Sequence, residues 1–129
     1  MKKLGLASLA LATAFALTGC GCSTGTYKPY SYTFGDTEYK CGKNSDDYLD
    51  AKHFCDSKTI TLKSKGVGYY GEVKEENKLF YKIEDKKLYF RESEDDEWID
   101  TGFEVKSGKL IRTIPGTVLT PKIVTVYKK

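Results

Sequence analysis

The chain has 129 residues, of which 40% are hydrophobic, so it is long enough for one domain with a modest core. Its 21 basic and 18 acidic side chains give a net charge of +3, and Lys alternates with Glu or Asp along the chain. A nucleic-acid-binding protein attracts phosphates with a basic stripe, and this charge pattern therefore argues against that class.

The N-terminal segment has the layout of a secretory signal. Lys2 and Lys3 precede an apolar run over residues 4–17, which is too short to span a membrane comfortably. The run ends in a tetrapeptide that resembles the lipobox of bacterial lipoproteins, Leu17-Thr18-Gly19-Cys20. The resemblance implies that residues 1–19 are a signal peptide and that Cys20 becomes the lipidated first residue.

The same resemblance implies where the protein lies. A diacylglycerol group and an amide-linked acyl chain on Cys20 would hold it on a membrane, because more than one chain makes anchoring stable. Gly21 stands where Asp would retain a lipoprotein at the inner membrane, so the outer membrane is expected. Because Lys2 and Lys3 leave with the signal, 19 basic and 18 acidic side chains remain, and the mature chain is close to neutral.

Three cysteines remain for an oxidising compartment once Cys20 is acylated. The favoured pair is Cys41 with Cys55, which closes a loop of about 15 residues and would stabilise the fold by roughly 3 kcal/mol. Cys22 is then left as a free thiol, as a bridge that makes a dimer of two chains, or as a competitor for one of the other two cysteines.

The first part of the mature chain divides into a tether and a strand. Residues 20–28 are small and polar and predict a flexible tether, which Pro29 ends. Residues 29–129 are expected to form a single β-rich domain. In residues 30–34 aromatic and hydroxyl side chains alternate as in a half-buried strand, and residues 37–41 predict a second short strand.

The pattern changes to a helical one over residues 45–55. Ser45 is suited to cap a helix, and Asp46 with Asp47 suit the positive end of its dipole. A helix of two or three turns is therefore expected. Since so short a helix is unstable by itself, the bridge between Cys41 and Cys55 would hold it in place.

Beyond residue 58 the chain alternates apolar and polar residues between short polar connections. These runs predict about eight strands, the last at residues 123–127, and strands joined by tight turns are antiparallel. We expect an all-β, up-and-down meander that closes as a small barrel, with a two-sheet sandwich as the alternative. The pattern of residues 87–114 resembles that of lipocalin-like bacterial domains.

The interior of such a barrel decides whether it holds a ligand. Eight strands leave an interior that is just filled by side chains or just able to hold a small molecule. The alternation puts Tyr69, Tyr81, Phe90 and Phe103 on the inward face, and this large set favours a filled barrel. Trp98, the single tryptophan, is expected to plug the core or one end, with a place at a ligand mouth as the alternative.

An acidic run is the densest charge feature of the chain. Its simplest interpretation is a solvated hairpin turn, but its charge would also steer a basic partner. Calcium is a weaker alternative, because the run lacks the spacing and the glycine of a known calcium loop, and no metal or other cofactor is expected. The candidate partner-binding residues are Glu92, Glu94, Asp95, Asp96, Glu97 and Trp98.

Motifs of enzymes are missing from the sequence, which has no H-E-x-x-H, no G-x-S-x-G and no phosphate loop. Asp50 and His53 lie three residues apart, but a short surface helix more often carries such residues for solubility, so no catalysis is expected. We expect a lipid-anchored envelope protein that binds a protein partner, as an accessory, an inhibitor or an immunity-type factor. The alternative is a lipocalin-like carrier of a small apolar ligand.

Overall fold

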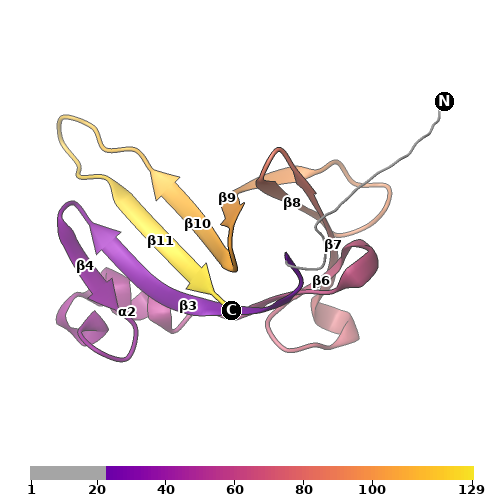
Figure 1. Ribbon diagram of the computed structural model, residues 1–129, viewed down its shortest axis with the longest axis horizontal. Coiled ribbons are helices and arrows are strands. Elements are labelled where there is room, and N and C mark those ends of the chain that lie inside the picture. The colour runs from indigo at the N-terminus through magenta and orange to yellow at the C-terminus, as the bar shows by residue number, and fades with distance from the viewer. Residues whose placement is uncertain (1–22) are drawn as a thin grey trace.

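The computed structural model describes residues 23–129, and Figure 1 shows the arrangement of their elements. The expected signal peptide, the lipidation site Cys20 and the third cysteine, Cys22, lie outside the described residues. The strands are β3 (Gly25–Phe34), β4 (Thr37–Lys40), β5 (Ile60–Leu62), β6 (Val67–Tyr70), β7 (Lys78–Glu84), β8 (Lys87–Arg91), β9 (Ile99–Lys106), β10 (Lys109–Ile114) and β11 (Ile123–Lys128). The helices are η2 (Ser45–Asp47), α2 (Leu49–Cys55), η3 (Ser64–Gly66) and η4 (Glu75–Asn77).

Eight of the nine described strands form a closed antiparallel β-barrel, which confirms the predicted meander and decides against the sandwich. Neighbouring strands follow the order β11-β10-β9-β8-β7-β6-β5-β3, and β11 also pairs with β3 to close the ring. These two strands run side by side in Figure 1. The ninth strand, β4, pairs with the second half of β3.

Two tight turns explain why neighbouring strands fold back as predicted. Asp85 and Lys86, between β7 and β8, have φ values of 58° and 68°, and Ser107 and Gly108, between β9 and β10, have values of 39° and 81°. Positive φ at both loop positions belongs to the turn whose twist matches that of two antiparallel strands. The local chemistry of these turns therefore favours the hairpins that build the barrel.

β3 begins earlier than the sequence predicts, and the domain boundary expected at Pro29 falls inside it. Tyr27 is fully buried, so residues 25–28 belong to the barrel and not to the tether. Pro29 has no backbone N–H to donate, and the register shifts at this point, where Tyr127 pairs with Pro29 but Val126 pairs with Ser31. The bulge lets a proline lie within a paired strand, which the sequence pattern did not indicate.

The expected helix is interrupted. Tyr48 separates η2 from α2 with an extended backbone, φ −143° and ψ 123°, and the side chain of Ser45 does not provide the expected cap. The ring of Tyr48 lies 5.3 Å, between centroids, from the rings of both Phe34 and Tyr39. Packing against these two strand residues outweighs the helical preference of the segment.

The predicted disulfide between Cys41 and Cys55 is present, with the two Cα atoms 5.5 Å apart. It links the residue after β4 to the last residue of α2, and Ala51 in the same helix is fully buried. α2 packs against β3. Within residues 23–129, no helix has both the length and the apolar character needed to cross a membrane.

The hydrophobic core occupies the barrel interior. Tyr81, Phe90 and Phe103 point inward, as predicted, and pack with the core. Fully buried side chains of this core come from four different strands, and they are Tyr27, Leu62, Leu88 and Leu110.

The predicted inward position of Tyr69 is wrong. Gly68 pairs with the buried Leu62 and shares its face, so Tyr69 lies on the outward face, and Tyr70, although 43% exposed, shares the inward face with its partner Ile60. The cause is lack of space, since a Cβ on Gly68 would lie 3.1 Å from the Leu79 Cδ1 atom. A small inward residue thus interrupts the alternation of large side chains on which the prediction depended.

Candidate functional site

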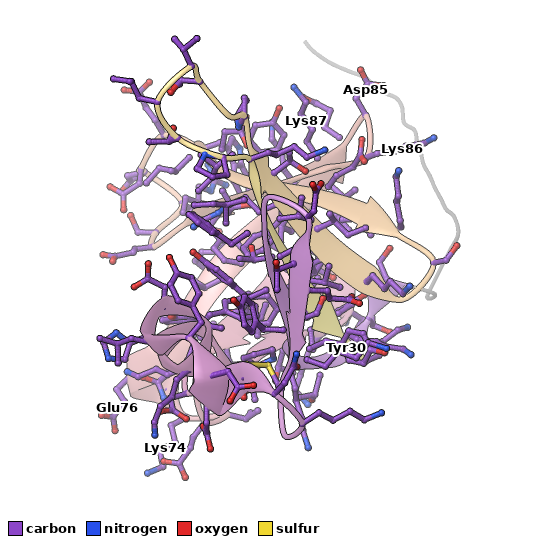
Figure 2. The ribbon with its side chains drawn as sticks, turned by 90° about the vertical axis from the view of Figure 1, so that its left-hand side faces the viewer. Tyr30, Lys74, Glu76, Asp85, Lys86 and Lys87 are labelled. Atoms are coloured by element: carbon purple, nitrogen blue, oxygen red, sulfur yellow. A yellow bond between two sulfur atoms is a disulfide. The ribbon has the colours of Figure 1, made fainter. Side chains whose placement is uncertain are left out.

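The barrel has two different ends. We call the first the closed end. β3 begins there, and the turns between β7 and β8 and between β9 and β10 also lie there. β11 ends at the same place, because the backbone N–H of Lys129 donates to the Gly108 carbonyl in the second of these turns, at 3.1 Å. At the second, the open end, lie α2 and the connections over residues 71–77, 92–98 and 115–122. Figure 2 shows Asp85 and Lys86 at the closed end, opposite Lys74 and Glu76.

A cavity of about 320 Å³ opens at the open end. Its ten lining residues come from α2, from the segment after it and from β5, β6, β8, β9, β10 and β11, so it lies inside the ring of strands. We call it the open-end cavity. Small-molecule sites are typically concave, apolar spaces of about 300 Å³ or more with a few placed polar groups, and this cavity is at the lower limit.

Aromatic side chains make much of the cavity wall. The ring of Tyr127 meets the rings of Phe54 and Phe103 edge-on, each with centroids 5.4 Å apart. Phe90 and Ile60 add further apolar surface. Tyr127 and Phe103 in this wall are almost fully buried, and Phe54 lies on the helix that the disulfide ties down.

The polar groups of the cavity are one cation and several hydroxyls. Arg112 and Thr125 pair across β10 and β11, and Thr101 lies on β9. The Thr101 hydroxyl donates to the Leu88 carbonyl at 2.8 Å. Burial, followed by the nearby Tyr70, raises the pKa of Tyr127, although a hydrogen bond with Ser57 and the positive charge of Arg112 oppose the rise. The Tyr127 hydroxyl is therefore protonated at neutral pH.

A glycine makes room for Arg112. Gly102 has a φ of 83°, and a Cβ there would lie 3.0 Å from the Arg112 Cδ atom. The guanidinium carbon of Arg112 lies 5.7 Å from the centroid of the Phe103 ring. An irregular register between β8 and β9 accompanies this arrangement, and bulges of this kind commonly redirect side chains at barrel rims.

The acidic run predicted as a partner-binding surface forms an exposed loop between β8 and β9. The backbone N–H of Asp96 donates to the Ser93 carbonyl at 3.1 Å, which shapes its turn. Within the described residues, no three His, Cys, Asp or Glu side chains are arranged to hold a metal ion. The loop brings together the five predicted carboxylates, Glu92, Glu94, Asp95, Asp96 and Glu97.

Trp98 does not plug the core, so that prediction is wrong. It is half-buried on the outer surface, where the Arg91 guanidinium carbon lies 4.1 Å and the Lys82 Nζ atom 5.2 Å from its ring centroid. Lys82 also lies 5.2 Å from the ring centroid of Tyr89, another outward residue. Cation–π contacts stabilise such exposed rings, so the indole packs without entering the barrel.

Two further features lie at the open end. Val118 and Leu119 form the almost fully exposed tip of the loop between β10 and β11, and the Thr117 hydroxyl fixes this tip by accepting the N–H of Leu119 at 3.1 Å. A polar hollow lies beside the loop 71–77, whose Lys74 and Glu76 are marked in Figure 2. The hollow carries charges of both signs and favours no one class of ligand.

The cavity residue that the sequence analysis missed is Arg112. The alternation of the sequence along β10 could have identified it. Arg112 lies two residues after the buried Leu110, so its side chain is on the same inward face of the strand. The same argument applies to Thr125, two residues before the buried Tyr127.

The fold and the cavity together define a small closed antiparallel β-barrel that is filled at one end and hollow at the other. Comparison of the chain with protein-family models, with curated protein sequences and with solved structures gives no match.

Proposed function

We propose that this protein is a lipid-anchored envelope protein that binds a small, largely apolar ligand in the open-end cavity and does not transform it. The observation that carries the proposal is a cavity of about 320 Å³ inside a closed eight-stranded barrel. Barrels of this size either fill with side chains or hold one small molecule. In this barrel, side chains fill the closed end, and the open end has room for a small molecule. The cavity favours the carrier, which the sequence ranked second, over the protein-binding module.

The lining of the cavity supports binding without catalysis. None of its ten described residues is His, Cys, Asp, Glu or Lys, so the lining contains no imidazole, carboxylate or amine that could activate the hydroxyl of Ser57. Asp50 and His53 are exposed on α2 and do not line the cavity.

The proposed anchor at Cys20 suits this arrangement. β3 begins at the closed end and has 10 residues, so its far end is about 30 Å away at the rise of a strand. A membrane attached through Cys20 would lie toward the closed end, and the open-end cavity would face away from it. Labelling with a palmitate analogue that is lost in Cys20→Ser tests the anchor, and separation of the two membranes tests the outer-membrane location.

Ligand binding is tested with the form that contains residues 23–129, which keeps every described strand, the core and the disulfide. After cooperative unfolding has shown that this form is folded, it is titrated with 1-naphthylamine, a small fluorescent probe that is neutral at pH 7. Thr125→Phe should fill the cavity and weaken probe binding at least tenfold. The matched control, Thr113→Phe on the outward face of the neighbouring strand, should leave binding unchanged. Failure of the wild-type protein to bind the probe would refute the proposal.

A protein-binding role is the second candidate, and the apolar tip formed by Val118 and Leu119 favours it. The tip and the acidic loop both lie at the open end, so a basic partner would be steered by charge and held by apolar contact. Replacing the five carboxylates of residues 92–97 with amides should slow association with such a partner and flatten its salt dependence. An unchanged association rate would remove this candidate.

A dimer bridged through Cys22, one of the three alternatives for this residue, stays a prediction. Non-reducing electrophoresis of the lipidated chain should show a species of twice the mass that Cys22→Ser abolishes. A monomer under oxidising conditions would contradict it.

A further inference from the structure

We infer that the ligand of the open-end cavity carries one carboxylate, which Arg112 binds, on an apolar body that fits among the aromatic side chains. The inference rests on the proposed function and names the class of its ligand. It depends on the charge, position and surroundings of Arg112 and on the size of the cavity.

The charge of the cavity is unbalanced. Arg112 is its single charged lining residue among residues 23–129, and none of the three ion pairs in that range involves it. A guanidinium has five N–H donors in a planar fork that matches the two oxygens of a carboxylate. Its contact with the face of the Phe103 ring leaves the N–H edges available to a ligand anion.

Arg112 is exposed and lies at the mouth of the open-end cavity, next to Gly102 and the ring of Phe103. Gly102 leaves the space through which its methylene groups pass, and the Phe103 ring lies against its guanidinium. A Cβ at residue 102 would lie 3.0 Å from the Arg112 Cδ atom and 3.2 Å from its Cγ atom, so the Arg112 side chain would have to shift by a few tenths of an ångström. The strands therefore hold the cation above the aromatic wall, where a ligand with its apolar end inside would present its polar end.

Hydroxyl groups around Arg112 complete a site for an anion. Thr125, which pairs with Arg112 across the sheet, is buried, and Tyr127 next along β11 on the same face keeps its proton at neutral pH. Both hydroxyls are donors to a carboxylate oxygen that points toward β11. A buried carboxylate needs such partners, because desolvation without hydrogen bonds is costly.

The cavity volume limits the size of the ligand. At about 30 Å³ for each water-sized group, 320 Å³ corresponds to about ten non-hydrogen atoms. Since Phe54, Phe90 and Phe103 supply the apolar wall, the body of the ligand is a short acyl chain or a single ring. Octanoate and phenylacetate have this size, and octan-1-ol and 2-phenylethanol are their neutral counterparts.

The experiment measures how strongly each of these four compounds displaces 1-naphthylamine from the form that contains residues 23–129. For at least one pair of compounds, the carboxylate should bind about tenfold more tightly than its alcohol. This ratio corresponds to the lower end of the range for hydrogen bonds to charged groups, and we choose the lower end because the mouth of the cavity is open to water. In Arg112→Gln this preference should fall below twofold while alcohol binding stays unchanged. Arg112→Lys, which keeps the charge and loses the fork, should give an intermediate preference.

Arg91→Gln is the matched control, because Arg91 also lies against an aromatic ring but on the outer surface, and it should keep the full preference. If the probe binds and neither carboxylate binds more tightly than its alcohol, the inference about the carboxylate is overturned and the proposed function stands. A preference that survives in Arg112→Gln overturns it as well. If the wild-type protein binds neither probe nor alcohols, the proposed function itself fails.

Discussion

Replacing both Cys41 and Cys55 with alanine tests whether the disulfide stabilises the fold through the loop that it closes. Both residues are only half-buried, so the loss of two sulfur atoms removes little core packing. The two cysteines are separated by 14 positions, which is a loop of about 15 residues. The chain-entropy relation gives about 10 cal/mol/K for this loop, or about 3 kcal/mol of unfolding free energy at 25 °C.

The same value predicts a shift of the midpoint temperature. A domain of about 107 residues has an unfolding entropy of roughly 0.22 kcal/mol/K, so a loss of 3 kcal/mol lowers its Tm by about 13 °C. Urea and thermal unfolding followed by circular dichroism measure both quantities. Asp47→Ala, an exposed substitution inside the same loop, is the matched control and should change the free energy by less than about 0.5 kcal/mol.

A loss below about 1 kcal/mol with an unchanged dependence on urea would refute the reasoning. It would mean that the loop is already restricted in the unfolded chain without the bridge.

Three further predictions concern the barrel. Leu88→Ala should cost about 3–5 kcal/mol of unfolding free energy, measured by urea denaturation, because Leu88 is fully buried and its loss leaves a cavity; a cost below about 1 kcal/mol would contradict this. Gly68→Ala should cost about 1–3 kcal/mol in the same assay, since the new Cβ would lie 3.1 Å from the side chain of Leu79. A stabilised variant would contradict this and would show that the side chain of Leu79 moves aside without cost. Burial raises the pKa of Tyr127, so the folded protein holds this proton more tightly than the unfolded chain does, and stability falls as the pH rises above 10.0. The unfolding free energy of Tyr127→Phe should therefore fall less steeply with pH across this range. Equal slopes for the two proteins would contradict the assignment.

Local alternation predicted the strands and favoured a barrel, but it left the two-sheet sandwich open, and the pairing of β11 with β3 decided for the barrel. Each hairpin has its turn residues, its period of two and its polar connection within a few neighbouring positions. The disulfide was predictable because Cys41 and Cys55 are the pair that closes a short loop within the domain. These features depend on near neighbours in the chain, which a single sequence displays directly.

The errors arose where distant parts of the chain meet. Tyr48 leaves the helical conformation because its ring packs between residues of β3 and β4, and no local signal announces that contact. Gly68 occupies an inward position because Leu79 fills the space beside it, which reversed the phase assigned to Tyr69. Trp98 stays outside because Arg91 and Lys82 cover its faces.

The open-end cavity was beyond prediction for the same reason. Phe54, Phe90 and Arg112 come from three separate parts of the chain, and their side chains meet through the curvature of the closed sheet. Alternation along β10 points Arg112 inward, but whether that interior is empty depends on how all eight strands taper. Volume is a property of the whole barrel, whereas the pattern describes one strand at a time.

The pairing of β3 with β11 has a consequence for the order in which the protein forms. During synthesis from the N-terminus, β3, one edge of the future ring, is made before the other described strands, and β11, the opposite edge, is made after all of them. Until β11 is made, β3 exposes unpaired backbone groups, so the incomplete chain is prone to aggregation. The final folding step is slow, because the contacts between β3 and β11 are distant in sequence. Removing about the last seven residues would delete β11 and leave that edge of β3 permanently unpaired, so closure of the barrel depends on the C-terminal strand.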